Sequence, residues 1–218
     1  MPHFVEESRD LRFFDLLQLM QDRIMERTSY FGIKTYKNPI DFWVYQEIIC
    51  AHRPDVIIEI GNCFGGSTLA LAHLLDNLSH GRVIGVDTCH AMVAPLARAH
   101  PRITLVEGDA CAVYGQVRSL IGSEEKVLII EDSAHTYSNT LAVLVRYSGL
   151  IPPGGYFIVE DGICHHGLEV GPAPGPYEAC RDFVASTPDF EIDRDRESFC
   201  ITWNPKGFLR RKAGNDAG

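Results

Sequence analysis

The stretch that decides the fold reads Val56-Ile57-Ile58-Glu59-Ile60 and runs directly into Gly61-Asn62-Cys63-Phe64-Gly65-Gly66-Ser67. Four β-branched residues around one acid predict a buried strand, and the glycine-rich segment after it predicts a tight loop that opens a helix. Glycine allows such a turn and lets a ligand come close to the backbone. The sequence therefore places a ligand-binding loop at the carboxyl end of a core strand.

The same alternation of strand and helix continues along the chain. The predicted strands are residues 56–60, 82–86, 103–107, 127–131 and 156–160. The helical segments predicted between them are residues 67–78, 92–100, 114–121 and 139–150. Such alternation implies right-handed crossovers, so we predict a three-layer α/β fold with a Rossmann-like, doubly wound and mainly parallel sheet.

Both ends of the chain depart from this alternation. Amphipathic helices are predicted at 9–27 and 40–51, with a loop at 29–39, and we interpret residues 1–52 as an N-terminal helical cap. Residues 53–212 form the predicted main domain, and 213–218 a disordered tail. A helix at 177–186 precedes two predicted strands, 190–193 and 199–203, which we expect to form an antiparallel hairpin at the sheet edge.

Composition excludes several classes of function. The chain has 218 residues and a formal net charge of −9, with a pI near 5.4, which argues against a nucleic-acid or anionic-membrane partner. A basic run between Lys206 and Lys212 reads as a solvated tail. Seven cysteines without a C-x-x-C spacing predict neither a zinc site nor a disulfide framework. We therefore expect a protein of the reducing cytoplasm, and no apolar run reaches transmembrane length.

Two of the predicted strands end in the same acidic pair, Glu131-Asp132 and Glu160-Asp161. Carboxylates at the ends of buried strands are costly to desolvate unless a cation or ligand meets them. If the two strands are neighbours in a parallel sheet, their carboxyl ends open onto one crevice. Several oxygens converging there suit a hard divalent ion such as Mg²⁺ or Ca²⁺.

Acids at the ends of the first three strands favour a nucleoside cofactor. Glu59 precedes a glycine loop whose spacing differs from the G-x-G-x-x-G of NAD enzymes, and this combination is typical of S-adenosylmethionine binding. Asp87 is placed to hold a ribose diol, with a helix N-cap as its alternative role. Asp109 and Ala110 follow the third predicted strand, a position where methyl-donor enzymes often bind the adenine amino group. The full predicted cofactor set is Glu59, Gly61, Asn62, Gly65, Ser67, Asp87, Asp109 and Ala110.

Histidines near the acidic pairs have different expected roles. His135 comes three residues after Asp132 and can face the same crevice. His165 and His166 follow Asp161 but lack a third imidazole or thiolate at ligand spacing, so we expect exposed loop residues. The Gly/Pro-rich segment 167–176 cannot be helix or interior strand. It forms either a lid over the site or a solvent loop.

Further motifs complete a set found from about residue 39 to residue 211. They are Tyr45-Gln46-Glu47, Gly65-Gly66-Ser67, Asp132-Ser133-Ala134-His135, Val159-Glu160-Asp161-Gly162, Gly175-Pro176-Tyr177-Glu178-Ala179 and Asn204-Pro205-Lys206-Gly207-Phe208-Leu209-Arg210. The set resembles the cephalosporin-hydroxylase and rhamnosyl O-methyltransferase family. That resemblance implies a class I methyltransferase that uses S-adenosylmethionine and Mg²⁺ on hydroxyls of sugars or antibiotics. It also implies metal ligation by Asp132, Glu160 and Asp161, with His135 as the base.

The predicted function is transfer of a methyl group from S-adenosylmethionine to a hydroxyl of a glycosylated or hydroxylated natural product. Two alternatives remain open at this level: a nicotinamide-dependent oxidoreductase on the same sheet, and a non-catalytic partner protein that binds the nucleotide. Aromatic residues that could stack on the acceptor are Tyr30, Tyr36, Trp43 and Tyr177. The apolar N-terminal helix has more apolar surface than one face needs, which indicates a homo-oligomer.

Overall fold

The computed structural model describes residues 4–7 and 9–213, and its centre is a seven-stranded sheet of order β5-β4-β3-β6-β7-β9-β8. The strands are β3 (Val56–Ile60), β4 (Arg82–Asp87), β5 (Ile103–Glu107), β6 (Val127–Glu131), β7 (Tyr156–Val159), β8 (Phe190–Ile192) and β9 (Phe208–Arg211). The first five run parallel, and β9 pairs antiparallel with both β7 and β8. The predicted Rossmann-like, doubly wound sheet is confirmed.

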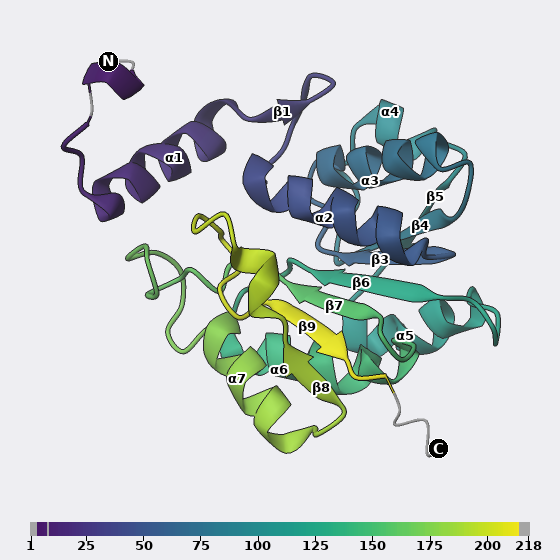
Figure 1. Cartoon of the computed structure of the whole chain (residues 1–218). Coiled ribbons are helices and arrows are strands. Elements are labelled where there is room, and N and C mark those ends of the chain that lie inside the picture. Colours follow the sequence, from purple (N-terminus) through teal and green to yellow (C-terminus); the bar gives the residue numbers. More distant parts are fainter. Residues whose placement is uncertain (1–3, 8, 214–218) are drawn as a thin grey trace.

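Helices cover both faces of the sheet and make three layers (Figure 1). One face carries α2 (Pro39–His52), α3 (Gly66–Asn77) and the short α4 (Pro95–Arg98). The other carries α5 (Ala110–Ser119), α6 (Tyr137–Tyr147) and α7 (Pro176–Ser186). Short 3-10 turns lie at η1 (Val5–Glu7), η2 (Ser148–Leu150) and η3 (Arg194–Glu197). The helix predicted at 92–100 is thus reduced to four residues.

Strand β3 shows why its sequence is apolar on both sides. Val56, Ile58 and Ile60 pack in the core under α5, α6 and α7, whereas Ile57 packs in the core under α2 and α3. A central parallel strand buried on both faces reads as a continuous apolar run. Glu59, on the same face as Ile57, is the exception and is fully buried.

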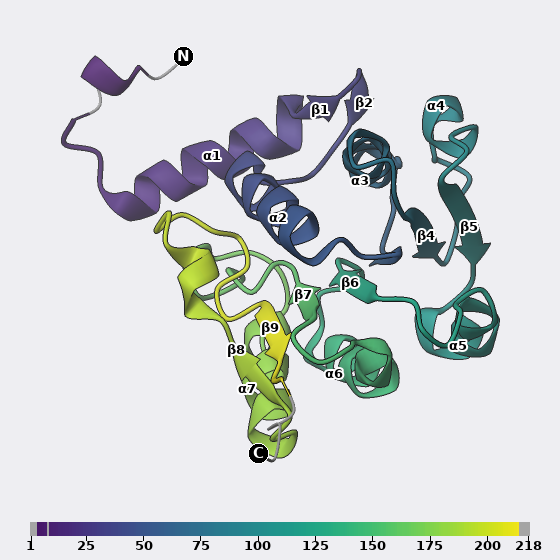
Figure 2. The same ribbon diagram turned by 45° about the vertical axis from the view of Figure 1, so that its right-hand side comes forward.

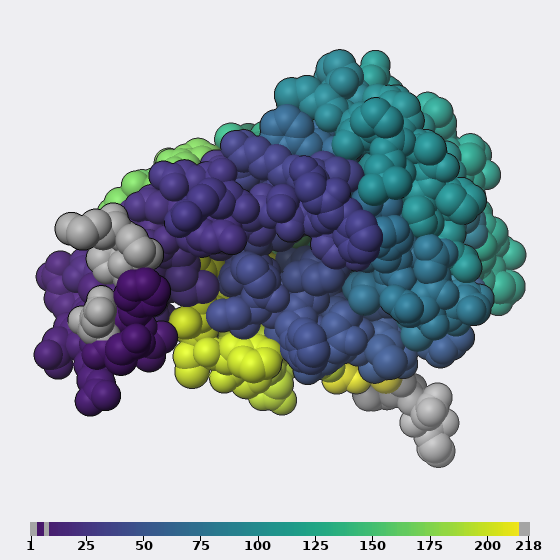
Figure 3. Space-filling view, turned by 90° about the horizontal axis from the view of Figure 1, so that it is seen from above, coloured from purple at the N-terminus to yellow at the C-terminus, as the bar shows by residue number. Residues whose placement is uncertain are grey.

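The N-terminal region stands partly apart from these layers. Helix α1 (Phe13–Arg27) has two buried side chains, Leu17 and Ile24, and lies away from the sheet (Figure 2). Seen from above, the N-terminal segment spreads across the face of the molecule (Figure 3). Helix α2, in contrast, packs directly on the sheet. The predicted division at residue 52 stays a prediction. No helix among residues 4–7 and 9–213 is long and apolar enough to cross a membrane.

The predicted loop at 29–39 contains a small hairpin formed by β1 (Ser29–Tyr30) and β2 (Ile33–Lys34). Phe31 and Gly32 form its turn with φ of +50° and +79°. Left-handed conformations at both central residues are those of the tightest hairpin turns. The turn therefore brings the chain straight back toward the start of α2.

The strand predicted at 199–203 is wrong, and β9 takes its place beside β7 and β8. Asp41 explains the difference, because its carboxylate accepts hydrogen bonds from Thr202 Oγ1 at 2.5 Å and from the Trp203 backbone N–H at 2.8 Å. The basic run between Lys206 and Lys212 is not a tail, because Phe208–Arg211 form β9 in the sheet, although Arg210 and Lys212 are exposed as expected. The disorder predicted for the tail lies almost entirely outside the described residues.

Candidate active site

A cavity of about 590 Å³ lies at the carboxyl ends of β3, β4 and β6. The strand order reverses direction at β3, and such a switch point is where open α/β sheets bind ligands. Most of the predicted site residues line the cavity: Gly61, Asn62, Ser67, Asp87, Asp109, Ala110, Asp132, His135 and Asp161. Three predicted residues, Glu59, Gly65 and Glu160, do not line it.

Gly61 joins the glycine loop to the acidic centre. Its φ is +93°, and a Cβ built on it would lie 1.9 Å from the backbone carbonyl oxygen of Asp132. Any side chain here would therefore collide with the loop that follows β6. This close approach places the predicted cofactor loop directly beside the predicted metal ligands.

Glu59 is fully buried and does not line the cavity, but it contacts Asn62, which does. Its Oε2 accepts a hydrogen bond from Asn62 Nδ2 at 2.9 Å and another from Thr68 Oγ1. Its Oε1 has no hydrogen-bond partner among the described residues. Burial raises the pKa of Glu59. The acid thus orients Asn62, whose own side chain borders the cavity, and keeps one free acceptor.

Asp87 holds the same loop from the neighbouring strand. Its Oδ2 accepts the backbone N–H groups of Asn62 at 2.8 Å and Cys63 at 3.0 Å. Burial opposes its ionisation, but these backbone donors outweigh burial and lower the pKa of Asp87. Asp109 is the N-cap of α5 and accepts from the Ala112 N–H at 2.9 Å. The ribose and adenine contacts assigned to these acids stay predictions.

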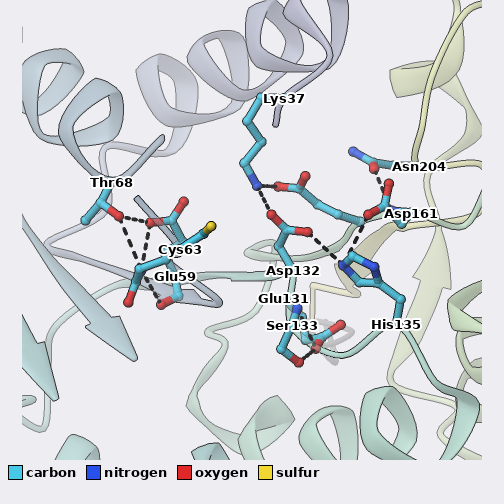
Figure 4. Close-up of polar contacts among 12 residues, drawn as sticks. Lys37, Glu59, Cys63, Thr68, Glu131, Asp132, Ser133, His135, Asp161 and Asn204 are labelled. Carbon is cyan, nitrogen blue, oxygen red and sulfur yellow. Dashed lines mark hydrogen bonds and ion pairs between the residues drawn. The ribbon is translucent and has the colours of Figure 1, made fainter. Parts of the chain in front are cut away.

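The acidic centre brings together side chains from the ends of β6 and β7 (Figure 4). His135 Nε2 lies 3.0 Å from Asp132 Oδ1 and 3.1 Å from Asp161 Oδ2. The ligand atoms of these three residues lie within 4.8 Å of one another, which is close enough to share one ion. Two carboxylates that line the same cavity fit a hard divalent cation.

Lys37 is the functional candidate that sequence reasoning missed. Its Nζ lies 2.5 Å from Asp132 Oδ2 and also forms an ion pair with Glu160 Oε1 (Figure 4). The lysine side chain is 8% exposed. It follows the small hairpin and precedes Asn38, whose side chain caps α2 at the Ile40 N–H. The Asn38-Pro39 pair predicts where α2 begins, but nothing local predicts that Lys37 points inward.

Charges around His135 strongly favour its protonated form. Burial opposes the positive charge, yet the hydrogen bond to Asp132 and the charge of Asp161 outweigh it and raise the pKa of His135 to about 9. This is the direction expected from the neighbouring carboxylates. Burial raises the pKa of Asp161 to about 6, with His135 opposing the shift. For Asp132, the charge of Lys37 outweighs burial and lowers the pKa.

The backbone of the His135 loop is fixed by Glu131, the other acid of its pair. Glu131 is fully buried and accepts hydrogen bonds from the Ser133 backbone and hydroxyl and from Asn139. His135 itself has a φ of +53°. The acid that faces away from the cavity thus stabilises the loop that carries the histidine.

The remaining candidates separate clearly. His165 and His166 are exposed, as predicted. Tyr177 is covered by His166, whose ring stacks on it at 3.6 Å, and by Lys206 at 4.5 Å from its centroid. Among the four aromatic candidates for the acceptor, Tyr36 lines the cavity. The 167–176 loop contributes two cavity-lining residues, Val170 and Gly171, which does not decide between a lid and a solvent loop.

Comparison with known proteins agrees with this geometry. The family model described as Rhamnosyl O-methyltransferase/CmcI matches residues 22–212. The chain belongs to this family. A rhamnosyl O-methyltransferase of Mycobacterium bovis is 34% identical over 195 residues, covering 86% of this chain and 80% of that protein. The corresponding protein of Mycobacterium leprae is 36% identical over 197 residues, with 87% and 85% covered.

Solved structures support the same conclusion. A CmcI structure without ligand superposes with a TM-score of 0.68 and 25% identity, covering 86% of this chain and 77% of that chain. A CmcI structure described with Mg and SAM also gives 0.68, at 22% identity, covering 97% and 89%, and shows the shared fold. The predicted enzyme class, an S-adenosylmethionine-dependent O-methyltransferase, is thereby confirmed.

Proposed function

We propose that this enzyme methylates a hydroxyl of a sugar or sugar-bearing natural product, with a divalent cation at Asp132 and Asp161 and with His135 as the base. The observation that carries the proposal is the Asp132–His135–Asp161 cluster, which faces the cavity beside the Gly61 loop. The names of the mycobacterial relatives, rhamnosyl O-methyltransferases, support a sugar hydroxyl as the acceptor.

The cofactor is assigned to the part of the cavity between the glycine loop and α5. Gly61 lines this part of the cavity, and its lack of a side chain lets the loop after β6 pack directly against it. Asn62, oriented by Glu59, is available for the amino-acid end of S-adenosylmethionine. Asp87 and Asp109 border the same space and have carboxylate oxygens for the ribose and adenine ends. In this proposal the sulfonium points toward the acidic centre.

Asp132 and Asp161 are the residues best placed to hold the cation. Both line the cavity, whereas Glu160, the third predicted ligand, does not line it and pairs with Lys37. When bound, a divalent cation supplies positive charge that lowers the pKa of the acceptor hydroxyl and of the imidazole. Mg²⁺ is the ion that carboxylate oxygens and a hydroxyl favour here.

His135 removes the acceptor proton as the new bond forms. An aliphatic hydroxyl gives its proton to the imidazole of His135, its oxygen forms a bond to the methyl carbon, and the carbon–sulfur bond breaks, leaving a neutral thioether. General-base catalysis contributes about 10²–10⁴-fold, and alignment of oxygen, methyl and sulfur supplies up to roughly 7–11 kcal/mol. Asp132 and Asp161 both contact Nε2, so the two carboxylates fix the position of the imidazole at the acidic centre.

The decisive experiment follows methyl transfer from labelled S-adenosylmethionine to rhamnosylated acceptors, with EDTA and then with added Mg²⁺. We expect EDTA to abolish turnover and Mg²⁺ to restore it. A rate that does not depend on metal would contradict the assignment of Asp132 and Asp161 as metal ligands. The two alternatives left open by the sequence, a nicotinamide-dependent oxidoreductase and a non-catalytic partner protein, are not supported by the family to which the chain belongs.

Helix α1 supports a homo-oligomer. Phe13 and Phe14 are 56% and 45% exposed near its start, and Met25 is 42% exposed near its end. Apolar side chains gathered on one helix that packs through only two buried residues favour contact with another subunit. We assign the enzyme to the cytoplasm, because its seven cysteines are all free and a reducing compartment keeps them so.

A further inference from the structure

The cavity extends past the acidic centre to a second end beside α1. The side chains that line this end come from α1, from the segment before β9 and from the 167–176 loop: Gln21, Ile24, Trp203 and Val170. Ile24 and Trp203 belong to one buried apolar cluster, and Val170 packs against it. Of these four side chains, Gln21 is the polar one. An apolar wall with one polar group suits an uncharged ligand that has both an apolar surface and hydroxyls.

Trp203 connects this end of the cavity to the acidic centre. Its backbone carbonyl accepts the N–H of Ile163 at 3.0 Å, two residues after Asp161. The next residue, Asn204, accepts the Asp161 N–H through Oδ1 at 3.2 Å. Helix α5, which borders the predicted cofactor end, lies well away from α1 in both ribbon views (Figures 1 and 2). An acceptor whose reacting hydroxyl lies at the acidic centre can therefore extend toward α1.

The side chain of Gln21 is oriented by the indole of Trp203. Trp203 Nε1 donates a hydrogen bond to Gln21 Oε1 at 2.6 Å. Because an indole N–H can only donate, the amide oxygen must face the tryptophan. Trp203 is itself fixed, since it is 5% exposed and its backbone N–H donates to Asp41 at 2.8 Å. Among the described residues Trp203 is the hydrogen-bond partner of this amide, so both N–H donors of Gln21 stay available to a ligand.

We propose that Gln21 is a specificity-determining residue of the acceptor site. Its amide N–H groups bond a hydroxyl of the acceptor sugar other than the one that is methylated, while the sugar packs against the apolar wall of Ile24, Trp203 and Val170. This inference rests on the proposed function and names the part of that site that holds the acceptor. A pyranose fits both features, because it has an apolar face of C–H bonds and a rim of hydroxyls.

Gln21→Met tests the role of the amide. Methionine keeps the length and helix propensity of the side chain and removes both donors. We measure methyl transfer to p-nitrophenyl α-L-rhamnoside at saturating S-adenosylmethionine and Mg²⁺. The KM for the rhamnoside should rise about 3–10-fold, the contribution of one hydrogen bond between uncharged groups. The kcat should stay within about twofold, and the affinity for S-adenosylmethionine in calorimetry should not change.

Monodeoxy analogues of the same rhamnoside separate recognition from a merely structural role. Wild-type enzyme should lose about 3–10-fold in kcat/KM on the analogue that lacks the hydroxyl bound by Gln21. The Gln21→Met enzyme should treat that analogue and the parent rhamnoside alike, because it has no donor left to lose. If Gln21 served only to support Trp203, the variant would instead lose the same factor on every acceptor.

Gln18→Met is the matched control. Gln18 lies three residues earlier on α1, donates from Nε2 to Asp22 Oδ1 at 2.9 Å and does not line the cavity. This variant should behave as wild type on every acceptor.

Two results would overturn the role of Gln21. One is a Gln21→Met enzyme whose KM for the rhamnoside equals that of wild type. The other is a loss of kcat/KM by one common factor on the parent and on all monodeoxy analogues. Either result leaves the proposed function standing, because the wild-type enzyme would still methylate the rhamnoside. A wild-type protein that transferred no methyl group to any rhamnoside would overturn both.

Discussion

Replacement of His135 by asparagine tests the centre of the proposed chemistry. His135 has a left-handed φ of +53°, a conformation that asparagine adopts more readily than most residues. The variant therefore removes the base with little backbone strain. The imidazole is 30% exposed and contacts both cavity-facing carboxylates, so its loss leaves the cofactor loop untouched.

The expected loss of turnover follows from the geometry. Among the described residues that line the cavity, His135 carries the one imidazole, so no equivalent base can replace it. Loss of a general base costs about 10²–10⁴-fold, or ~3–5 kcal/mol in the barrier. Affinity for S-adenosylmethionine should stay within about threefold, because the predicted cofactor contacts come from the ends of β3, β4 and β5.

The assay combines single-turnover methyl transfer at saturating Mg²⁺ with calorimetric titration of the cofactor. His165→Asn is the matched control, since His165 is also a histidine at positive φ (+57°), is exposed and does not line the cavity. It should behave as wild type in both measurements. A His135→Asn enzyme that turns over within threefold of wild type would refute the base assignment. Equal losses of turnover and cofactor affinity would indicate a binding role instead.

Three further perturbations test the fold and the assembly. Gly61→Ala should prevent stable folding or abolish cofactor binding, because its Cβ would lie 1.9 Å from a backbone oxygen. Gly115→Ala in α5 is the control: its Cβ meets open space, so it should stabilise the protein by ~0.5–1 kcal/mol. Thermal melting of the two variants distinguishes these outcomes. Burial raises the pKa of Asp41 from 3.8 to about 6. The protonated carboxyl therefore stabilises the folded state fully below pH 3.8, and this stabilisation is lost as the pH rises from 3.8 through 6. The free energy of unfolding of Asp41→Asn relative to wild type should therefore improve by up to ~3 kcal/mol between pH 3.5 and 7, and a pH-independent difference in urea melts would contradict this. Serine at Phe13 and Phe14 together should lower the apparent mass in gel filtration, and an unchanged elution volume would argue against α1 as the subunit contact.

The core of the fold was predictable because its signals are local. β3 is buried on both faces, so its sequence is apolar without alternation, and the glycines after it mark the turn. The C-terminal sheet edge was predicted wrongly for a non-local reason. Residues 199–203 have strand-like composition, but Asp41, far away in sequence, takes the backbone N–H of Trp203. Strand β9 then pairs with β7 and β8 at the sheet edge, where the sequence pattern had predicted a strand formed by residues 199–203.

The acidic centre shows the same limit in its chemistry. The types of residue were predictable, since strand ends that carry carboxylates require a partner for them. The identity of that partner was not, because Lys37 lies 95 residues from Asp132 and 123 from Glu160. The sequence analysis predicted Glu160 as a metal ligand without its ion pair with Lys37, and that assignment stays a prediction.

The side chains of the acidic centre contact one another in series. Glu160, Lys37, Asp132, His135 and Asp161 form one chain of contacts in which acid and base alternate. Each cavity-lining carboxylate of this chain also contacts a basic side chain: Asp132 contacts Lys37 and His135, and Asp161 contacts His135. Lys37 contacts Asp132 and Asp132 contacts His135, so the lysine is linked to the imidazole through one carboxylate. The acidic centre at the ends of β6 and β7 therefore includes a side chain from the segment that joins the N-terminal hairpin to α2.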